Sequence, residues 1–257
     1  GIGNVNEHDG YHGYWTLDFE KVSPYLYSKE SGMEEGSKKY LNKLVKKLHK
    51  NGIKLILDMV VNHTGYHNSS YSNYEYKKFS DEHFNKGGHG DIKGELAGLP
   101  DLNHDIPYVA DYFVQNILSW IEETGIDGIR MDTAKHVEKR FWYYFKSYIK
   151  GKYKNISLIG EILDFRPEKI AEYQKKHDFD SVFDFPLCGT LKEVFIYNKS
   201  MKRLARPRVS SHEEQGVLDI DSCYTNANRL VTLVDNHDIG CRIKTEILNK
   251  WGHWDRN

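Results

Sequence analysis

Two acidic residues, each at the end of a short apolar run, could form a pair of reacting carboxyl groups. Asp132 follows the run 126–131, and Glu161 ends the run 156–161. Both runs are typical of buried strands, and neighbouring parallel strands end at the same edge of a sheet, about 4.8 Å apart. We therefore expect the two carboxyl groups to meet, one as a nucleophile and the other as a proton donor.

Arg130 supports the assignment of Asp132 as the nucleophile. Residues two apart on a strand share a face, so Arg130 and Asp132 are predicted to point the same way. A guanidinium beside a carboxylate favours the charged form of the acid, which a carboxylate nucleophile requires. The alternative is that Asp132 only caps the following helix and that Arg130 neutralises it. The further acids Glu161 and Asp238 favour the catalytic interpretation.

Glu161 has different neighbours in the sequence. Ile159, Ile162 and Leu163 predict apolar surroundings, which favour the neutral form of a carboxyl group. Asp132 and Glu161 would then differ in acidity, as a nucleophile and a proton donor must. A separation of roughly 5–5.5 Å between two carboxyl groups is the one that retaining glycosidases use.

Five stretches of the sequence resemble, in the same order along the chain, the signature regions of the α-amylase family of glycoside hydrolases. They extend over residues 58 to 238, and each alone would be a weak signal. The matching stretches are Asp58–His63, Leu99–Asn103, Gly128–His136, Gly160–Leu163 and Val234–Asp238. The resemblance implies an α/β fold, a (β/α)8 TIM barrel with an irregular domain inserted after the third strand.

The resemblance also implies a reaction and its catalytic residues. The expected activity is retaining hydrolysis of α-1,4-glucosidic bonds in starch, glycogen or maltodextrins, through a covalent glycosyl-aspartate on Asp132. Glu161 would act as acid and base, and Asp238 would help to distort the sugar ring. Two alternatives remain open: a transglycosylase such as a cyclodextrin glucanotransferase, and a non-catalytic glucan-binding relative. The stretch Gly160–Leu163 resembles the hydrolases more than the Trp-containing version of the transferases.

Several aromatic, histidine and basic residues are expected to bind the substrate by this resemblance. Apolar sugar faces pack on aromatic rings, while sugar hydroxyls need polar partners. Without the resemblance, core packing is the favoured interpretation of Tyr14 and Trp15, and a satisfied loop histidine that of His63. The expected substrate-binding residues are His12, Tyr14, Trp15, His63, Arg130, Lys135, His136 and His237.

A calcium ion is the cofactor that the resemblance implies. Its expected ligands are Asn62, Asp101 and the backbone carbonyl of His136, and Ca²⁺ takes six to eight such oxygen ligands. The remaining ligands cannot be identified from the sequence. The alternative is that Asn62 and Asp101 only form turns.

Helical and strand patterns alternate along most of the chain, as in an α/β protein. Predicted helices cover 34–50, 107–124, 141–153, 167–177 and 187–198, with shorter ones at 217–228 and from 239 onwards. Predicted strands lie near 53–61, 126–131, 156–161, 180–185 and 230–234. Residues 1–18 have a loop composition. The predicted organisation is barrel (1–63), irregular insertion (64–106) and barrel (107–257).

A closed barrel needs eight strands, and the sequence predicts about five. We therefore expect the first two strands, the eighth strand and a C-terminal β domain to lie outside this chain.

Charge and composition limit the classes of molecule that the protein is expected to bind. Lys plus Arg (36) nearly balance Asp plus Glu (37), which favours a neutral α-glucan over nucleic acid or an anionic membrane. Three cysteines predict neither a disulfide framework nor a zinc site. The sequence does not predict an oligomeric state or a compartment.

Overall fold

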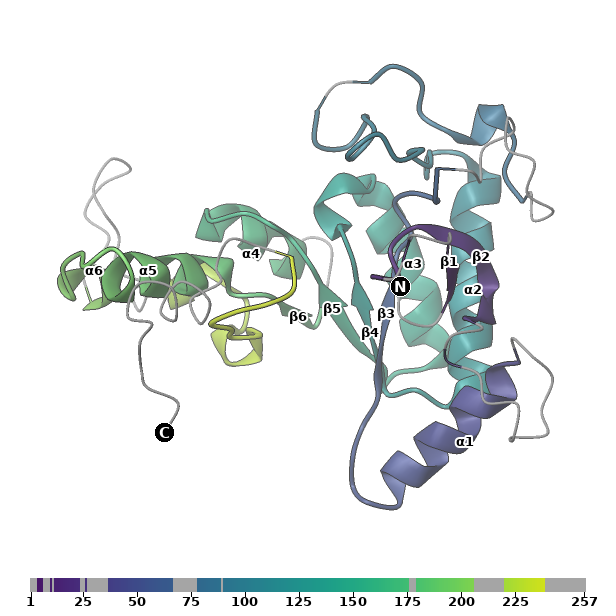
Figure 1. Ribbon diagram of the computed structural model, residues 1–257, viewed down its shortest axis with the longest axis horizontal. Coiled ribbons are helices and arrows are strands. Elements are labelled where there is room, and N and C mark those ends of the chain that lie inside the picture. The colour runs from purple at the N-terminus through teal and green to yellow at the C-terminus, as the bar shows by residue number, and fades with distance from the viewer. Residues whose placement is uncertain are drawn as a thin grey trace, which may run out of the picture. The chain divides into compact units, whose positions relative to one another are not determined.

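The computed structural model describes residues 4–6, 10, 12–23, 26, 37–66, 78–88, 90–175, 179–205 and 220–238 (Figure 1). The chain divides into two compact units, residues 1–161 and residues 162–257. The first unit contains Asp132 and Glu161, and the second contains Asp238.

Three parallel strands form the sheet of the first unit: β3 (Ile56–Met59), β4 (Gly128–Met131) and β5 (Ser157–Gly160). They lie side by side with β4 in the middle (Figure 1). The register pairs Asp58 with Arg130, and Arg130 with Ile159. All four residues of β4 are buried, as expected for a central parallel strand. The three corresponding predicted strands are confirmed, each shorter than its apolar run.

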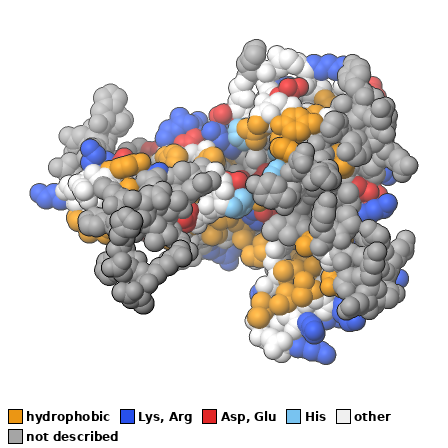
Figure 2. All heavy atoms as spheres, in the orientation of Figure 1, with side chains coloured by type: hydrophobic (Ala, Val, Ile, Leu, Met, Phe, Trp, Pro, Cys, Tyr) orange, Lys and Arg blue, Asp and Glu red, His pale blue; other side chains and the backbone are white. Residues whose placement is uncertain are grey.

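Helices alternate with these strands: α1 (Lys38–His49), α2 (Pro107–Thr124) and α3 (Lys139–Lys152). The bounds of α2 agree with the prediction, because Pro107 opens the helix and Gly125 ends it in a left-handed conformation with φ 75°. Ser37 caps α1 by accepting a hydrogen bond from the backbone N–H of Lys39. Figure 2 shows lysine side chains exposed around α1.

An antiparallel hairpin precedes these elements and was not predicted. It pairs β1 (Asn4–Asn6) with β2 (Thr16–Val22), so the expected loop over residues 1–18 is wrong at both strands. The carbonyl oxygen of Phe19 accepts hydrogen bonds from Trp120 Nε1 (2.8 Å) and Asn116 Nδ2 (3.0 Å), both on α2. These long-range bonds hold β2, and a local composition rich in Gly, His and Asn does not reveal them.

The inserted segment 64–106 is irregular where the structure describes it. It contains a 3₁₀ turn (Asp81–His83) and isolated β-bridges such as the one between His63 and Asp101. The division of the chain places this segment in the first unit. Its standing as a separate small domain stays a prediction.

The second unit contains α4 (Pro167–Lys175), β6 (Ser181–Val182), α5 (Phe185–Phe195) and α6 (Lys202–Ala205). The predicted strand 180–185 is shorter because the Asp184 carboxylate accepts from Leu187 N (3.1 Å) and caps α5. The predicted strand 230–234 is reduced to one parallel bridge between Phe183 and Val231.

The predicted helix 217–228 contains two 3₁₀ turns in its described part, Asp221–Cys223 and Ala227–Arg229. The predicted helix from 239 onwards lies outside the described residues, as does Cys241. Cys188 and Cys223 are free thiols. Among the helices in the described ranges, none has both the length and the apolar character needed to cross a membrane.

Substitution of Trp120 tests the attachment of the hairpin to α2. We expect Trp120→Phe to lower the free energy of unfolding by about 1–3 kcal/mol, because a fully buried side chain loses volume and a hydrogen bond. Urea unfolding of the complete gene product measures this loss. The control Tyr143→Phe, at a side chain that is 67% exposed, should change stability by less than about 0.5 kcal/mol. Equal stability of the two variants would contradict the prediction.

Candidate active site

Arg130 lies at the centre of a group of carboxylates at the ends of β3, β4 and β5. Its Nη1 atom is 2.6 Å from Asp132 Oδ1 and 2.8 Å from Asp58 Oδ1, and its Nη2 atom is 2.5 Å from Glu161 Oε1. The strand register explains these contacts, since Asp58 and Arg130 are directly paired and Asp132 lies two residues further on the same face. One guanidinium therefore contacts three carboxylates.

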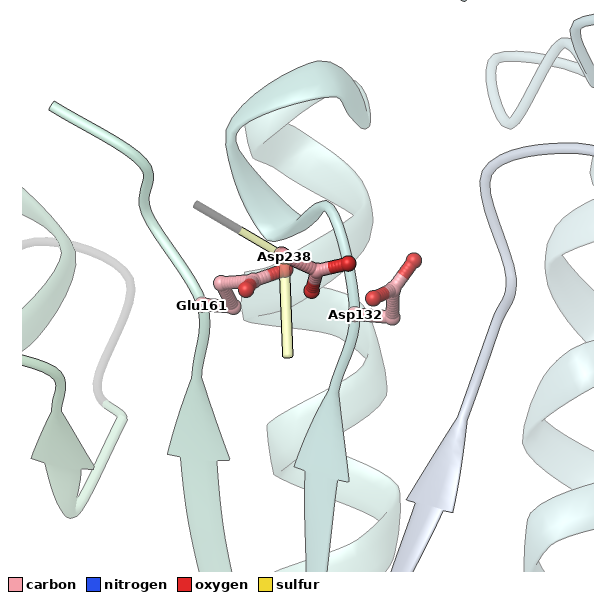
Figure 3. A group of neighbouring side chains, drawn as sticks. All are labelled: Asp132, Glu161 and Asp238. Carbon is pink, nitrogen blue, oxygen red and sulfur yellow. The ribbon is translucent and has the colours of Figure 1, made fainter. Parts of the chain in front are cut away.

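Asp132 and Glu161 lie at the carboxyl ends of neighbouring strands (Figure 3). Their side chains are buried, with Asp132 4% and Glu161 6% exposed. A carboxylate oxygen of one lies within 4.8 Å of a carboxylate oxygen of the other. Both backbones are held by hydrogen bonds at the strand ends, from Asp132 N to Met59 O and from Glu161 N to Met131 O, each 2.9 Å. The predicted meeting of the two acids is thus observed.

The surroundings of Glu161 differ from the prediction. Apolar neighbours were expected, but the Glu161 carboxylate contacts the Arg130 guanidinium and accepts a hydrogen bond from Thr133 N (3.1 Å). Ile162 is buried, whereas Leu163 is exposed. The residues next to Glu161 along the chain do not reveal Arg130, which reaches Glu161 from the adjacent strand. Arg130 thus serves both acids, and the expected contrast between a paired acid and an apolar one is wrong.

Asp58 and Tyr14 complete this network, in which no role for Asp58 was predicted from the sequence. Tyr14 donates a hydrogen bond from its hydroxyl to Asp58 Oδ2 (2.7 Å) and accepts one from Arg130 Nη1 (3.3 Å). Burial and the Asp58 charge raise the pKa of Tyr14. Burial alone would raise the pKa of Asp58, but nearby positive charge, which includes the Arg130 guanidinium, and the Tyr14 hydroxyl hold it below its ordinary value. The position of Asp58 near the end of a predicted strand was the feature of the sequence that could have indicated this role.

His12, Tyr14 and Trp15 form a cluster of rings at the start of β2. The His12 ring stacks on Tyr14 (centroids 5.8 Å apart) and meets Trp15 edge-on at 4.7 Å. All three side chains are half-buried, which differs from the fully buried state that core packing would give. The cluster joins the acids through the Tyr14 hydroxyl.

His63 is buried and satisfied. Its Nε2–H donates to the carbonyl of Tyr14 (3.1 Å), and its Nδ1 accepts from Asn62 Nδ2 (3.3 Å). Burial lowers the pKa of His63, consistent with a neutral ring. These contacts fit the alternative of a satisfied loop histidine, and a contact with substrate stays a prediction.

Lys135 and His136 contact the inserted segment at Asp91. The Nδ1–H of His136 donates to the Asp91 carbonyl (2.7 Å), and Lys135 Nζ lies 3.5 Å from the Asp91 carboxylate. In the second unit, His237 Nε2 lies 3.0 Å from Asp238 Oδ2, and the Asp238 N–H donates to Asn236 Oδ1. The expected roles of these four predicted residues toward a substrate stay predictions.

Asn62 and Asp101 lie on two segments that pair through their backbones. Leu102 N donates to Asn62 O (2.9 Å), and His63 and Asp101 form an antiparallel β-bridge. Asn62 Oδ1 is buried and has no hydrogen-bond partner among the described residues. Asp101 is 1% exposed and accepts from two neutral donors, Asn85 Nδ2 and Gly94 N. Burial raises the pKa of Asp101 to about 7. An unpaired amide oxygen and a buried acid are the groups that a hard cation such as Ca²⁺ would satisfy.

A pH-dependent stability difference should follow from the Asp58 contacts. Because the folded-state pKa of Asp58 lies below its ordinary value of 3.8, its carboxylate stabilises the fold above that pH and loses this effect as pH falls through the folded value. We expect Asp58→Asn to lower the free energy of unfolding at pH 7 by about 1–3 kcal/mol. The deficit should shrink below pH 3.8.

Urea unfolding at pH 7 and pH 3 measures this difference, with Glu122→Gln as a control at a side chain that is 63% exposed. The control should match the wild type at both pH values, since surface ion pairs contribute little. A deficit for Asp58→Asn that is equal at both pH values would contradict the role assigned to its charge.

Comparison with known proteins identifies the relatives of the chain. The family model for the alpha amylase catalytic domain matches residues 4–94 and 91–252. The Beta/alpha-amylase of Paenibacillus polymyxa is 33% identical over 242 residues, which cover 89% of this chain and 18% of that protein. The cyclomaltodextrin glucanotransferase of Bacillus licheniformis is 28% identical over 265 residues, which cover 93% of this chain and 34% of that protein.

Solved structures agree with the family match. The alpha-amylase from Geobacillus thermoleovorans, in complex with acarbose, has a TM-score of 0.76 and 31% identity over 97% of this chain. This chain spans 53% of that structure and smaller shares of the two relatives above. The predicted fold class, part of a (β/α)8 barrel, is confirmed. The chain belongs to the alpha-amylase family.

Proposed function

We propose that this chain carries the reacting residues of a retaining glycosidase that hydrolyses α-1,4-glucosidic bonds in starch, glycogen or maltodextrins. The observation that carries the proposal is the pair formed by Asp132 and Glu161, buried and within 4.8 Å of each other. This short separation of the two carboxyl groups fits the roughly 5–5.5 Å of retaining enzymes better than the roughly 6.5–9.5 Å that an inverting enzyme needs to hold a water.

The reaction has two steps. Asp132 attacks the anomeric carbon while Glu161 gives its proton to the leaving glycosidic oxygen, so that a covalent glycosyl-aspartate forms as the bond to the leaving sugar breaks. Glu161, now ionised, then removes a proton from water as the water attacks the same carbon. This step releases Asp132 and returns the proton to Glu161, with retention at the anomeric centre.

Arg130 would support both steps from one position. The surrounding carboxylates outweigh the effect of burial and raise the pKa of Arg130, so it stays a cation throughout the cycle. At 2.6 Å from Asp132 Oδ1 it places a positive charge beside the attacking carboxyl group. Its contact with Glu161 would stabilise the carboxylate that is left after proton donation.

The half-buried rings of His12, Tyr14 and Trp15 suit a sugar substrate, since they offer both apolar faces and polar atoms near the acids. We assign Lys135, His136 and His237 to sugar hydroxyls and Asp238 to ring distortion, as the family resemblance implies. The proposed substrate is thus an α-glucan.

Calcium binding is a second part of the proposal. Asn62 Oδ1 and the Asp101 carboxylate would hold the ion, together with the backbone carbonyl of His136. When bound, the ion would supply positive charge to a buried acid and connect the inserted segment to the exit of β3. It would stabilise the site and take no part in bond cleavage.

Removal of either acid tests the mechanism. In the complete gene product, Asp132→Asn and Glu161→Gln should each lower kcat on maltoheptaose by about 10³-fold or more, because each acid is needed in both steps. Reducing-sugar release measures the rates, and proton NMR of the first-formed product measures its anomeric configuration. Glu122→Gln is a matched control on the surface of α2 and should keep wild-type activity. Near-wild-type activity in either acid variant, or an inverted product, would rule out the proposal.

The same reaction mixtures separate hydrolysis from glycosyl transfer. The similarity to a cyclomaltodextrin glucanotransferase favours transfer as the second candidate function. A hydrolase should give short linear maltooligosaccharides on chromatography, whereas a transferase should give cyclic or elongated products.

Calcium removal tests the cation site. At a free Ca²⁺ concentration a hundredfold above Kd, binding should add about 2.7 kcal/mol to the free energy of unfolding, and a chelator should remove it. Asp101→Asn should abolish most of this gain, while Glu82→Gln, an exposed acid of the same segment, should keep it. Thermal melts with Ca²⁺, Mg²⁺ or chelator provide the measurement. A gain that is unchanged in Asp101→Asn would place the site elsewhere.

A further inference from the structure

Thr133, the residue after Asp132, has an unusual backbone conformation. Its φ of 49° and ψ of 32° lie in the left-handed region, which β-branched residues rarely adopt. The other non-glycine residues with positive φ in the described part of the chain, Ala97 and Asn198, are not β-branched. Such a conformation costs free energy and persists only where the surroundings impose it.

The side chain of Thr133 does not account for this conformation. Asn and Asp tolerate the left-handed region because their side chains form local hydrogen bonds, but Thr133 Oγ1 is buried and has no hydrogen-bond partner among the described residues. Hydrogen bonds from Asp132 N to Met59 O and from His136 N to Thr133 O hold the backbone on both sides of the turn.

The consequence of the turn is the direction of one backbone N–H. Thr133 N lies 3.1 Å from Glu161 Oε2, while the other oxygen of the same carboxylate, Oε1, contacts Arg130 Nη2. The Glu161 carboxyl group is therefore held at both oxygens, by a side chain on β4 and by the backbone just after β4. Two partners fix the rotation of a carboxyl group, which one partner alone would leave free.

We propose that Thr133 is a positioning residue that orients the proton donor Glu161 relative to the nucleophile Asp132. This inference rests on the proposed function. The residue directly after the nucleophile provides the contact, so the two reacting groups are linked through one peptide unit. The N–H also stabilises the carboxylate that Glu161 becomes after it has protonated the leaving oxygen.

The sharpest test removes this N–H and leaves the side chain in place. Incorporation of the α-hydroxy analogue of threonine at position 133 in the complete gene product replaces the Asp132–Thr133 amide by an ester. We expect kcat on maltoheptaose to fall about tenfold or more, as for the loss of a hydrogen bond to a charged group, with KM within about twofold. KM should change little because the N–H contacts Glu161.

A second substrate separates orientation of the acid from general damage. Maltosyl fluoride has a leaving group that needs no proton, so formation of the glycosyl-enzyme should keep close to its wild-type rate in the ester variant. The measurement is fluoride release in the first turnover, because the later hydrolysis step also uses Glu161. A purely structural role of Thr133 would lower this first-turnover rate as much as kcat on maltoheptaose. Thr133→Asn is the matched control, because Asn tolerates the left-handed conformation and keeps the N–H. Its loss of kcat should be clearly smaller than that of the ester variant.

Wild-type rates of the ester variant on maltoheptaose, equal losses on both substrates, or a loss in Thr133→Asn as large as in the ester variant would each overturn the inference. A wild-type protein that is inactive on both substrates would instead contradict the proposed function. The assays therefore distinguish failure of the positioning role from failure of the glycosidase assignment.

Discussion

The contact of one guanidinium with three carboxylates is the interaction on which the site depends. Buried carboxylates that approach one another repel, and removal of a charge from water is costly unless a partner compensates it. Arg130 provides that partner for Asp58, Asp132 and Glu161. Asp132 and Glu161 can therefore lie close enough to act on the same bond while buried. Loss of the guanidinium would leave these acids both repelling and desolvated.

The parallel sheet makes this arrangement possible through its register. Asp58, Arg130 and Ile159 occupy equivalent positions on β3, β4 and β5, and the next residues on the same face include Asp132 and Glu161. A shift of one residue in any of these strands would turn its acid toward the opposite face. The apolar residues between the polar ones, such as Met59, Ile129 and Met131, are fully buried and hold the register. The geometry of the site is thus a consequence of core packing below it.

Local patterns predicted those parts of the fold that depend on nearby residues. The helix α2 begins at Pro107 and ends before Gly125, and both signals are in the sequence. The strand β2 was missed because Trp120 and Asn116, about a hundred residues away, provide the donors that bind its Phe19 carbonyl. The same limit applies to the site. The ordered motifs indicated Asp132 and Glu161, but neighbours along the chain suggested apolar surroundings for Glu161, whereas its partner is Arg130 on an adjacent strand. Nor does any sequence pattern indicate the left-handed backbone of Thr133.

The features that suit this site for chemistry work against its stability. Buried ion pairs seldom stabilise a fold more than apolar residues of similar size would, and a β-branched residue in the left-handed region adds a further cost. The first unit offsets these costs away from the reacting groups. Phe113 and Trp120 on α2 and Phe141 and Phe145 on α3 are almost fully buried, and large buried aromatic side chains contribute most to such a core. These aromatic side chains lie on the helices, whereas the carboxylates lie at the strand ends. The core can therefore stabilise the unit without neutralising the charges that the reaction would use.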